Sequence, residues 1–247
     1  MLKITIIHFT HGINSSILSL KKGGLLMNLI NKENTINLAL RLMKLLASFI
    51  IITFGIVFML KADLGMNPWS TFAMGVSNVT HISFGHANQL IGLAILLLML
   101  SLKIYPGIAT ILDLTVIGFM VHIIEQLHVI STPNTLAMQL LMCISGLFMF
   151  CFGLIIYYKC GLGIGPRESI VMELVKKTNK GFATVKTTIE SSVFLCGVLL
   201  GGDFGIGTII ITVFTGRIME VLFKRYKYDV RAAEHLDIKN TFRYIKA

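Results

Sequence analysis

LGMNP at residues 64–68 returns as LGIGP at residues 162–166, and this pair of motifs is the best guide to the fold. The two copies stand 98 positions apart. With that shift, residues 54–118 match residues 152–216 at 17 of 65 positions. Unrelated sequence of ordinary composition would give about four or five matches over this length. The chain is therefore predicted to contain an internal duplication.

The composition around the motifs is that of a membrane protein. Hydrophobic residues make up 55% of the 247 residues and charged residues 14%, where a soluble domain carries about 25% charged residues. The net charge is +10, but the basic residues lie in loops and tails between long apolar runs. This distribution excludes a soluble globular protein, a disordered chain and a nucleic-acid-binding domain, and it predicts the lipid bilayer as the surroundings.

Apolar runs long enough, or nearly long enough, to cross a bilayer as helices occur six times. They are continuous and do not alternate as the strands of a barrel would, so we expect an all-α membrane protein with six transmembrane helices. The runs are residues 40–60, 87–102, 107–127, 136–158, 183–200 and 204–223.

The basic residues predict the orientation of these spans. Six, six and seven lysines and arginines lie in residues 1–44, 159–186 and 224–247, and none lies in residues 62–86 or 126–135. Because cytoplasmic loops carry the excess of positive charge, both termini are expected in the cytoplasm of a bacterial cell, with the chain in the inner membrane.

The predicted organisation begins with a cytoplasmic N-terminal region. The codons of residues 21–24 can spell a ribosome-binding sequence, so translation is expected to start at Met27 and residues 1–26 to be untranslated; the alternative is a disordered basic tail. The predicted parts are the N-terminal region 1–39, a first three-span repeat 40–128, a second three-span repeat 135–224 and a basic cytoplasmic tail 225–247.

Three spans in each repeat mean that the second copy enters the membrane from the opposite side. The two halves are then inverted repeats related by a pseudo-two-fold axis in the membrane plane, as in many secondary transporters. The first motif should face outside and the second the cytoplasm. A duplicated helical bundle without a transport role is the alternative.

Each motif is predicted to start a short amphipathic helix. Asn67 can cap the first, with Pro68 at its first position, and Gly165 precedes Pro166 in the second. A helix of about eleven residues cannot cross the membrane, so each should lie in the interface or re-enter partway.

Two interpretations of these loops are open. The backbone N–H groups at the helix starts could contact an anionic or polar solute, with Arg167 adding positive charge. Alternatively, each loop is a tight turn followed by an interfacial anchor, with Trp69 and Arg167 at the headgroups. The candidate loop site comprises Gly65, Asn67, Pro68, Gly163, Gly165, Pro166 and Arg167.

Charged residues inside the predicted spans form a second candidate site. Asp113, Glu190 and Arg217 should lie at a similar depth, and Glu220 is one turn nearer the cytoplasm. Arg217 could neutralise Asp113 or Glu190. The cluster is either a proton- or cation-coupled site or a structural ion pair between helices.

Other chemistry is weakly supported by the sequence. The four cysteines form no Cys-x-x-Cys pair, and no nucleotide-binding loop, nucleophile elbow or paired-carboxylate motif occurs. We therefore expect no metal, no cofactor and no enzymatic activity.

Residues 62–70 and 161–169 resemble the motifs of the YczE/YyaS/YitT-type bacterial integral membrane proteins. The likeness covers about residues 38–228. It implies a multi-spanning inner-membrane protein without an established activity, in a family sometimes discussed as possible transporters, and it defines no binding residues.

These observations predict a small-solute transporter or permease. The alternative is a non-transporting membrane factor that acts through a protein partner at the cytoplasmic face, by way of residues 159–186 or the tail.

Overall fold

The computed structural model describes residues 36–246, and all the regular secondary structure in this range is helical. The predicted start at Met27 and the region 1–26 lie outside the described residues. Six helices in the described range are long and apolar enough to cross a membrane, as the sequence predicted. They are Ile36–Lys61, α3 (Phe84–Ser101), Ile108–Gln126, α6 (Leu136–Cys160), α8 (Phe182–Leu199) and α9 (Ile206–Arg225).

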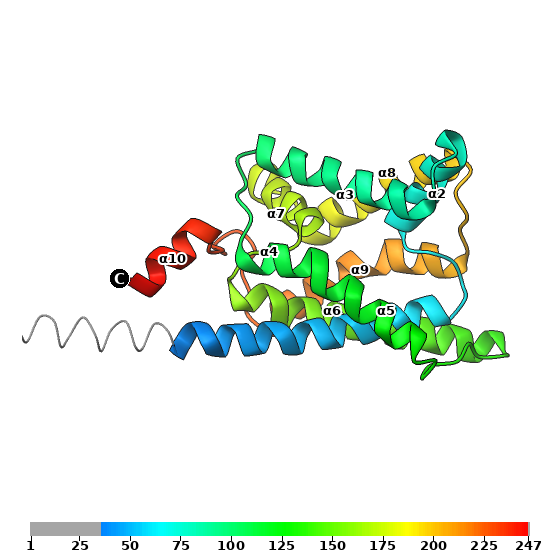
Figure 1. Ribbon diagram of the computed structural model, residues 1–247, viewed down its shortest axis with the longest axis horizontal. Helices are drawn as coiled ribbons and strands as arrows, with labels where there is room; N and C mark the ends of the chain where they lie inside the picture. Colours follow the sequence, from blue (N-terminus) through cyan, green and yellow to red (C-terminus); the bar gives the residue numbers. More distant parts are fainter. Residues whose placement is uncertain (1–35, 247) are drawn as a thin grey trace, which may run out of the picture.

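The six spans lie side by side along the long axis of the molecule, and successive spans run in opposite directions (Figure 1). The first described span therefore begins at the same end at which α9 finishes and the chain leaves toward α10 (Ile238–Lys246). We call this end of the bundle the tail side and the opposite end the far side.

The third span, Ile108–Gln126, is not a regular α-helix. It consists of α4 (Ile108–Leu112), a π-helical turn η1 (Asp113–Ile117) and α5 (Gly118–Gln126). This interruption was not predicted from the sequence. A π-helical turn widens the backbone locally and is frequent at functional sites. Here it carries Asp113, one of the predicted site residues.

The two short helices form where the motifs predicted them. They are α2 (Pro68–Thr80) and α7 (Pro166–Thr178), each of 13 residues. The Asn67 side chain caps α2 by accepting a hydrogen bond from the backbone N–H of Ser70 at 3.0 Å. At about 1.5 Å per residue, neither helix could cross a bilayer.

Each motif loop contacts the start of a span in the other half of the chain. The Leu64 carbonyl accepts a hydrogen bond from Gly207 N–H at 2.8 Å, and the Leu162 carbonyl accepts one from Ala109 N–H at 3.0 Å. Leu64 and Leu162 are 98 residues apart, and so are Ala109 and Gly207. The loops thus lock the two halves together through backbone contacts that match pairwise.

The main core lies between the first span, α6 and α9. Phe49, Tyr157 and Met219 are fully or almost fully buried there. The first span and α6 approach closely because two glycines face each other: a Cβ on Gly55 would come within 2.8 Å of the Gly146 carbonyl oxygen. Close approach at small residues is the usual way in which membrane helices gain packing energy.

Candidate functional site

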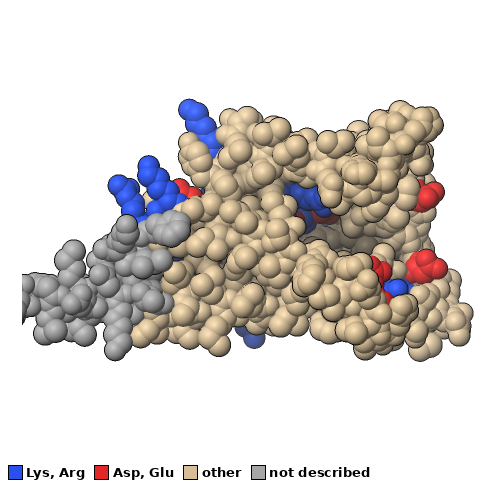
Figure 2. Space-filling view, viewed as in Figure 1, with Lys and Arg blue, Asp and Glu red and all other residues tan. Residues whose placement is uncertain are grey.

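A cavity of about 480 Å³ lies between the two motif helices. Figure 2 shows it as a hollow in one face of the molecule, between α2 and α3 on one side and α5 on the other, with charged atoms in its depth. Its walls are mainly apolar and include Met59, Phe84 and Phe150. Its polar lining includes Asn67, Ser70, Glu125, Arg167, Glu168, Lys186, Glu190 and Thr215.

The first turns of α2 and α7 meet at this cavity. The guanidinium carbon of Arg167 lies 4.7 Å from the centre of the Trp69 ring, a cation–π contact. These two residues were expected at opposite headgroup layers if the helices were interfacial anchors. That interpretation is wrong, because residues separated by a hydrocarbon layer of about 30 Å cannot touch.

A buried ion triad forms the charged part of the cavity lining. The Lys186 Nζ lies 2.8 Å from Glu190 Oε1 and 3.5 Å from Glu168 Oε1. Lys186 is 3% exposed and Glu190 is 7% exposed. Lys186 and Glu190 are one turn apart on α8, while Glu168 comes from the second motif. A buried ammonium needs such partners, because an unpaired charge away from water is very costly.

One oxygen atom of the triad has no hydrogen-bond partner among the described residues. This atom is Glu190 Oε2, which is buried. Buried oxygens are almost always hydrogen-bonded, so an unpaired one beside a cavity marks a position at which a bound molecule or water can donate.

Asp113 lies just behind this triad. A Cβ on Gly165 would collide with Asp113 Oδ2, so glycine at position 165 leaves the room that this carboxylate occupies. The Arg167 guanidinium interacts electrostatically with the carboxylates of Glu168, Asp113 and Glu190. The second motif therefore gathers a positive side chain and three acidic ones, from the third span, α7 and α8, in one region.

Arg217 and Glu220 do not belong to this group, so the predicted pairing of Arg217 with Asp113 or Glu190 is wrong. Arg217 is exposed and its guanidinium lies 5.9 Å from the ring centre of Phe214 on the same helix. Glu220 instead pairs with Lys224 at 3.7 Å and accepts a hydrogen bond from Ala183 N–H. The helix places both residues on faces of α9 that turn away from the cavity.

The motif glycines serve the backbone contacts between halves. Gly65 has φ of +110° and Gly163 has φ of +99°, a region that side chains rarely adopt. A Cβ on Gly163 would come within 2.7 Å of the Cα of Gly107, so this loop lies directly on the start of α4. The remaining predicted residue of this loop, Pro166, is buried at the start of α7.

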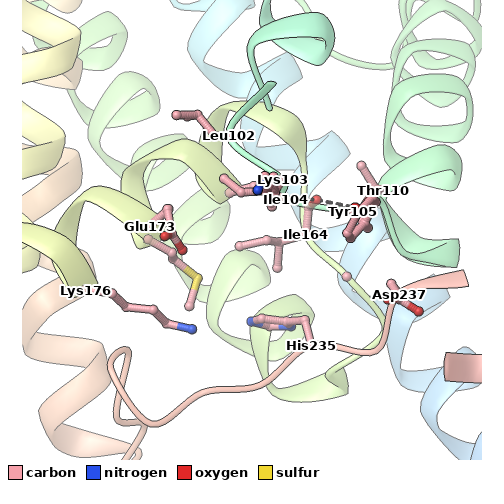
Figure 3. A pocket seen from close by; sticks show the side chains of 13 residues that line it. Leu102, Lys103, Ile104, Tyr105, Thr110, Ile164, Glu173, Lys176, His235 and Asp237 are labelled. Carbon is pink, nitrogen blue, oxygen red and sulfur yellow. Dashed lines mark hydrogen bonds between the residues drawn. The ribbon is translucent and has the colours of Figure 1, made fainter. Parts of the chain in front are cut away.

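A second, smaller pocket of about 270 Å³ lies at the tail side. It is bounded by the connection between α3 and α4, by α7 and by the segment after α9. Lys176 and His235 point toward each other across it (Figure 3). Burial, with a smaller contribution from Lys176, lowers the pKa of His235 to about 4, so this ring is neutral at pH 7.

Three further residues line the cavity: Glu168 and Lys186, which the sequence did not assign to a site, and Trp69, which was expected only as an anchor at the headgroups. Lys186 was assigned to a cytoplasmic loop with its basic neighbours, although its i,i+4 spacing to Glu190 is typical of a helical ion pair. That spacing was the available signal. The contact between Trp69 and Arg167 joins residues 98 positions apart and has no local signature.

Comparison with known proteins gives a family without an assigned activity. A family model described as a family of unknown function, DUF6198, matches residues 39–224. An uncharacterized protein of Haemophilus influenzae is 29% identical over 159 residues, which are 64% of this chain and 72% of the relative. The uncharacterized membrane protein YczE of Bacillus subtilis is 26% identical over 175 residues, 70% of this chain and 80% of YczE. No solved structure matches the chain.

Proposed function

The chain belongs to the family of unknown function DUF6198 and is homologous to YczE, and from this premise we propose that it is a transporter for a small polar or anionic solute. The observation that carries the proposal is the cavity at which the starts of α2 and α7 meet. A cavity lined by two helix N-termini and buried charges, in the depth of a membrane bundle, is the typical solute site of secondary transporters.

The proposed architecture is two inverted three-span repeats with both termini in the cytoplasm of a bacterial inner membrane. Two observations support it. The sequence matches itself with a shift of 98 residues, and the hydrogen bonds of Leu64 to Gly207 and of Leu162 to Ala109 obey the same shift. Reciprocal contacts of this kind are expected when two equivalent halves pack around a two-fold axis.

The cavity offers complementary groups for a solute. Arg167 makes no ion pair within 4.0 Å with a described residue, so its guanidinium can bind an acidic group of the solute while it stacks on Trp69. Glu190 Oε2 can accept a hydrogen bond from an N–H or O–H group. The apolar wall fits the carbon body. Lys186 pairs with two carboxylates, so its charge is offset within the protein and Arg167 is the cation left for the solute.

Trp69 provides a direct test, because it is the only tryptophan in the chain. Binding of the solute beside its ring should change its fluorescence. We expect members of a panel of amino acids and of mono- and dicarboxylates to change the emission of the purified protein, and the same compounds, labelled, to enter proteoliposomes. Arg167→Gln should weaken both effects by about tenfold or more, since a hydrogen bond to a charged group is lost.

Arg217→Gln is the matched control and should leave binding and flux unchanged, because Arg217 is exposed away from the cavity. Equal losses in the two variants would contradict the assignment of the site. Absence of flux together with a stably copurifying protein would favour the alternative function, a membrane factor that acts through a partner.

A further inference from the structure

On the far side, α2 is in direct contact with the connection between α8 and α9 of the other half. The Thr71 hydroxyl of α2 donates to the Asp203 carbonyl at 3.0 Å, and the Asn78 amide donates to the Gly201 carbonyl at 2.6 Å. These bonds tie α2 to the connection between α8 and α9. We call this contact the far-side seam.

Glycines allow the two segments of the far-side seam to approach each other closely. A Cβ on Gly202 would collide with the Thr71 carbonyl oxygen, and a Cβ on Gly75 would come within 2.6 Å of the Gly197 carbonyl oxygen. Any larger side chain at these positions would force the two segments apart.

The equivalent seam on the tail side carries larger residues and stays open. With the shift of 98 residues, Gly75 corresponds to Glu173, Gly197 to Met99, and Gly201 and Gly202 to Lys103 and Ile104. Instead of a closed seam, the structure has the tail-side pocket of about 270 Å³ between α7 and the connection from α3 to α4. The halves therefore do not close this side by themselves.

The pocket lies next to the central cavity. Gly163, Ile164 and Ser169 line the pocket, whereas Arg167 and Glu168 of the same loop line the cavity. The second motif is thus the wall between the two spaces, and the pocket is where a path from the cavity would reach the tail side.

A segment after α9, residues 226–237, crosses this pocket, and we call it the strap. His235 and Asp237 of the strap line the pocket. Arg231, near the middle of the strap, donates to the Asn179 carbonyl of the α7–α8 connection at 2.8 Å. Two residues further on, the Ala233 carbonyl accepts a hydrogen bond from the Lys176 ammonium at 2.8 Å.

The end of the strap contacts both halves of the chain. Leu236 N–H donates to the Gly161 carbonyl at 2.8 Å, and Ile238 N–H, directly after the strap, donates to the Pro106 carbonyl at 3.1 Å. The Tyr228 hydroxyl and His235 Nε2 lie 3.1 Å apart and hold the strap in its folded shape. The family match ends at residue 224, so the strap lies outside it.

We propose that the strap keeps the tail-side mouth of the solute path closed, and that solute passes this mouth only when the strap detaches from α7 and from the α3–α4 connection. This inference rests on the proposed transport function. It makes the C-terminal segment the regulator of the central site.

Cysteine labelling of the full-length protein in nanodiscs tests the strap. The four native cysteines are replaced by alanine, and Ser169→Cys places one thiol in the pocket. Tyr228→Phe with Arg231→Ala removes two strap hydrogen bonds and keeps the buried Val230. We expect this double substitution to raise the rate of alkylation by a maleimide about tenfold, since each lost hydrogen bond favours the detached strap.

Thr71→Cys is the matched control, because Thr71 corresponds to Ser169 with the shift of 98 residues and is fully buried in the far-side seam. Its alkylation should stay slow in the same double variant. An unchanged rate at position 169, or an equal rise at both positions, would overturn the proposal. A chain that ends at Lys227 should behave as the double variant does; if that chain does not fold, the double variant decides.

Labelling does not require transport, so the two proposals can fail separately. A responsive strap in a chain that shows no flux would refute the proposed function. Flux with an unresponsive strap would refute only this inference.

Discussion

Lys186→Met is expected to destabilise the folded protein by about 3–5 kcal/mol, because it leaves the carboxylates of Glu190 and Glu168 without their shared cation. Methionine has nearly the volume of lysine, so the loss measures charge pairing and not packing. The measurement is thermal unfolding in detergent, together with the amount of protein in the membrane. Adding Glu190→Gln should restore most of the loss, since one of the two stranded charges is then removed.

Lys177→Met is the control for this prediction. Lys177 pairs with Glu173 at 3.2 Å, also at i,i+4 spacing, but its side chain is 55% exposed. An exposed pair of this kind contributes about 1 kcal/mol or less. If Lys186→Met were tolerated as well as Lys177→Met, the buried triad would not be an element of the fold.

Gly65→Ala is expected to cost about 3 kcal/mol or more, for two reasons that add. The φ of +110° is one that a residue with a side chain rarely adopts. The new Cβ would also collide with the backbone nitrogen of Gly205, and backbone cannot rotate away as a side chain can. The loss should appear as a lower unfolding temperature and as reduced membrane content.

Gly92→Ala is the control, and its expected effect on the stability of the protein has the opposite sign. Gly92 lies within α3, and a Cβ there meets nothing within 4 Å. Alanine favours a helix over glycine by up to about 1 kcal/mol, so this variant should be unchanged or slightly more stable. A similar loss of stability in both variants would show that the contact between the first motif and the start of α9 does not stabilise the fold.

Much of the fold could be predicted because it depends on local patterns in the sequence. Six apolar runs gave the six spans, and Asn67 with Pro68 gave the start of α2 through the preference of these residues for the first turn of a helix. The duplication drew attention to both motif loops. The π-helical turn at Asp113 has no such local pattern, and the close approach of Asp113 to Gly165 joins distant parts of the chain.

The candidate site was predicted only in part. The sequence placed Arg167 and Glu190 in two separate candidate sites, whereas both line one cavity, and it paired Glu190 with the wrong cation. Depth along a helix can be estimated from residue number, whereas the face that a side chain takes depends on how the helices rotate when they pack. That is why Arg217 is exposed and Lys186 is the partner of Glu190.

The most direct test of the proposed inverted architecture is the sidedness of one matched pair of residues. Thr80 and Thr178 end α2 and α7, both are exposed, and they stand 98 residues apart. In a cysteine-free background, Thr80→Cys and Thr178→Cys are labelled with a membrane-impermeant maleimide in intact cells and in inside-out vesicles. The account predicts that Thr80→Cys reacts only in intact cells and Thr178→Cys only in inside-out vesicles; reaction of both from the same compartment would contradict it.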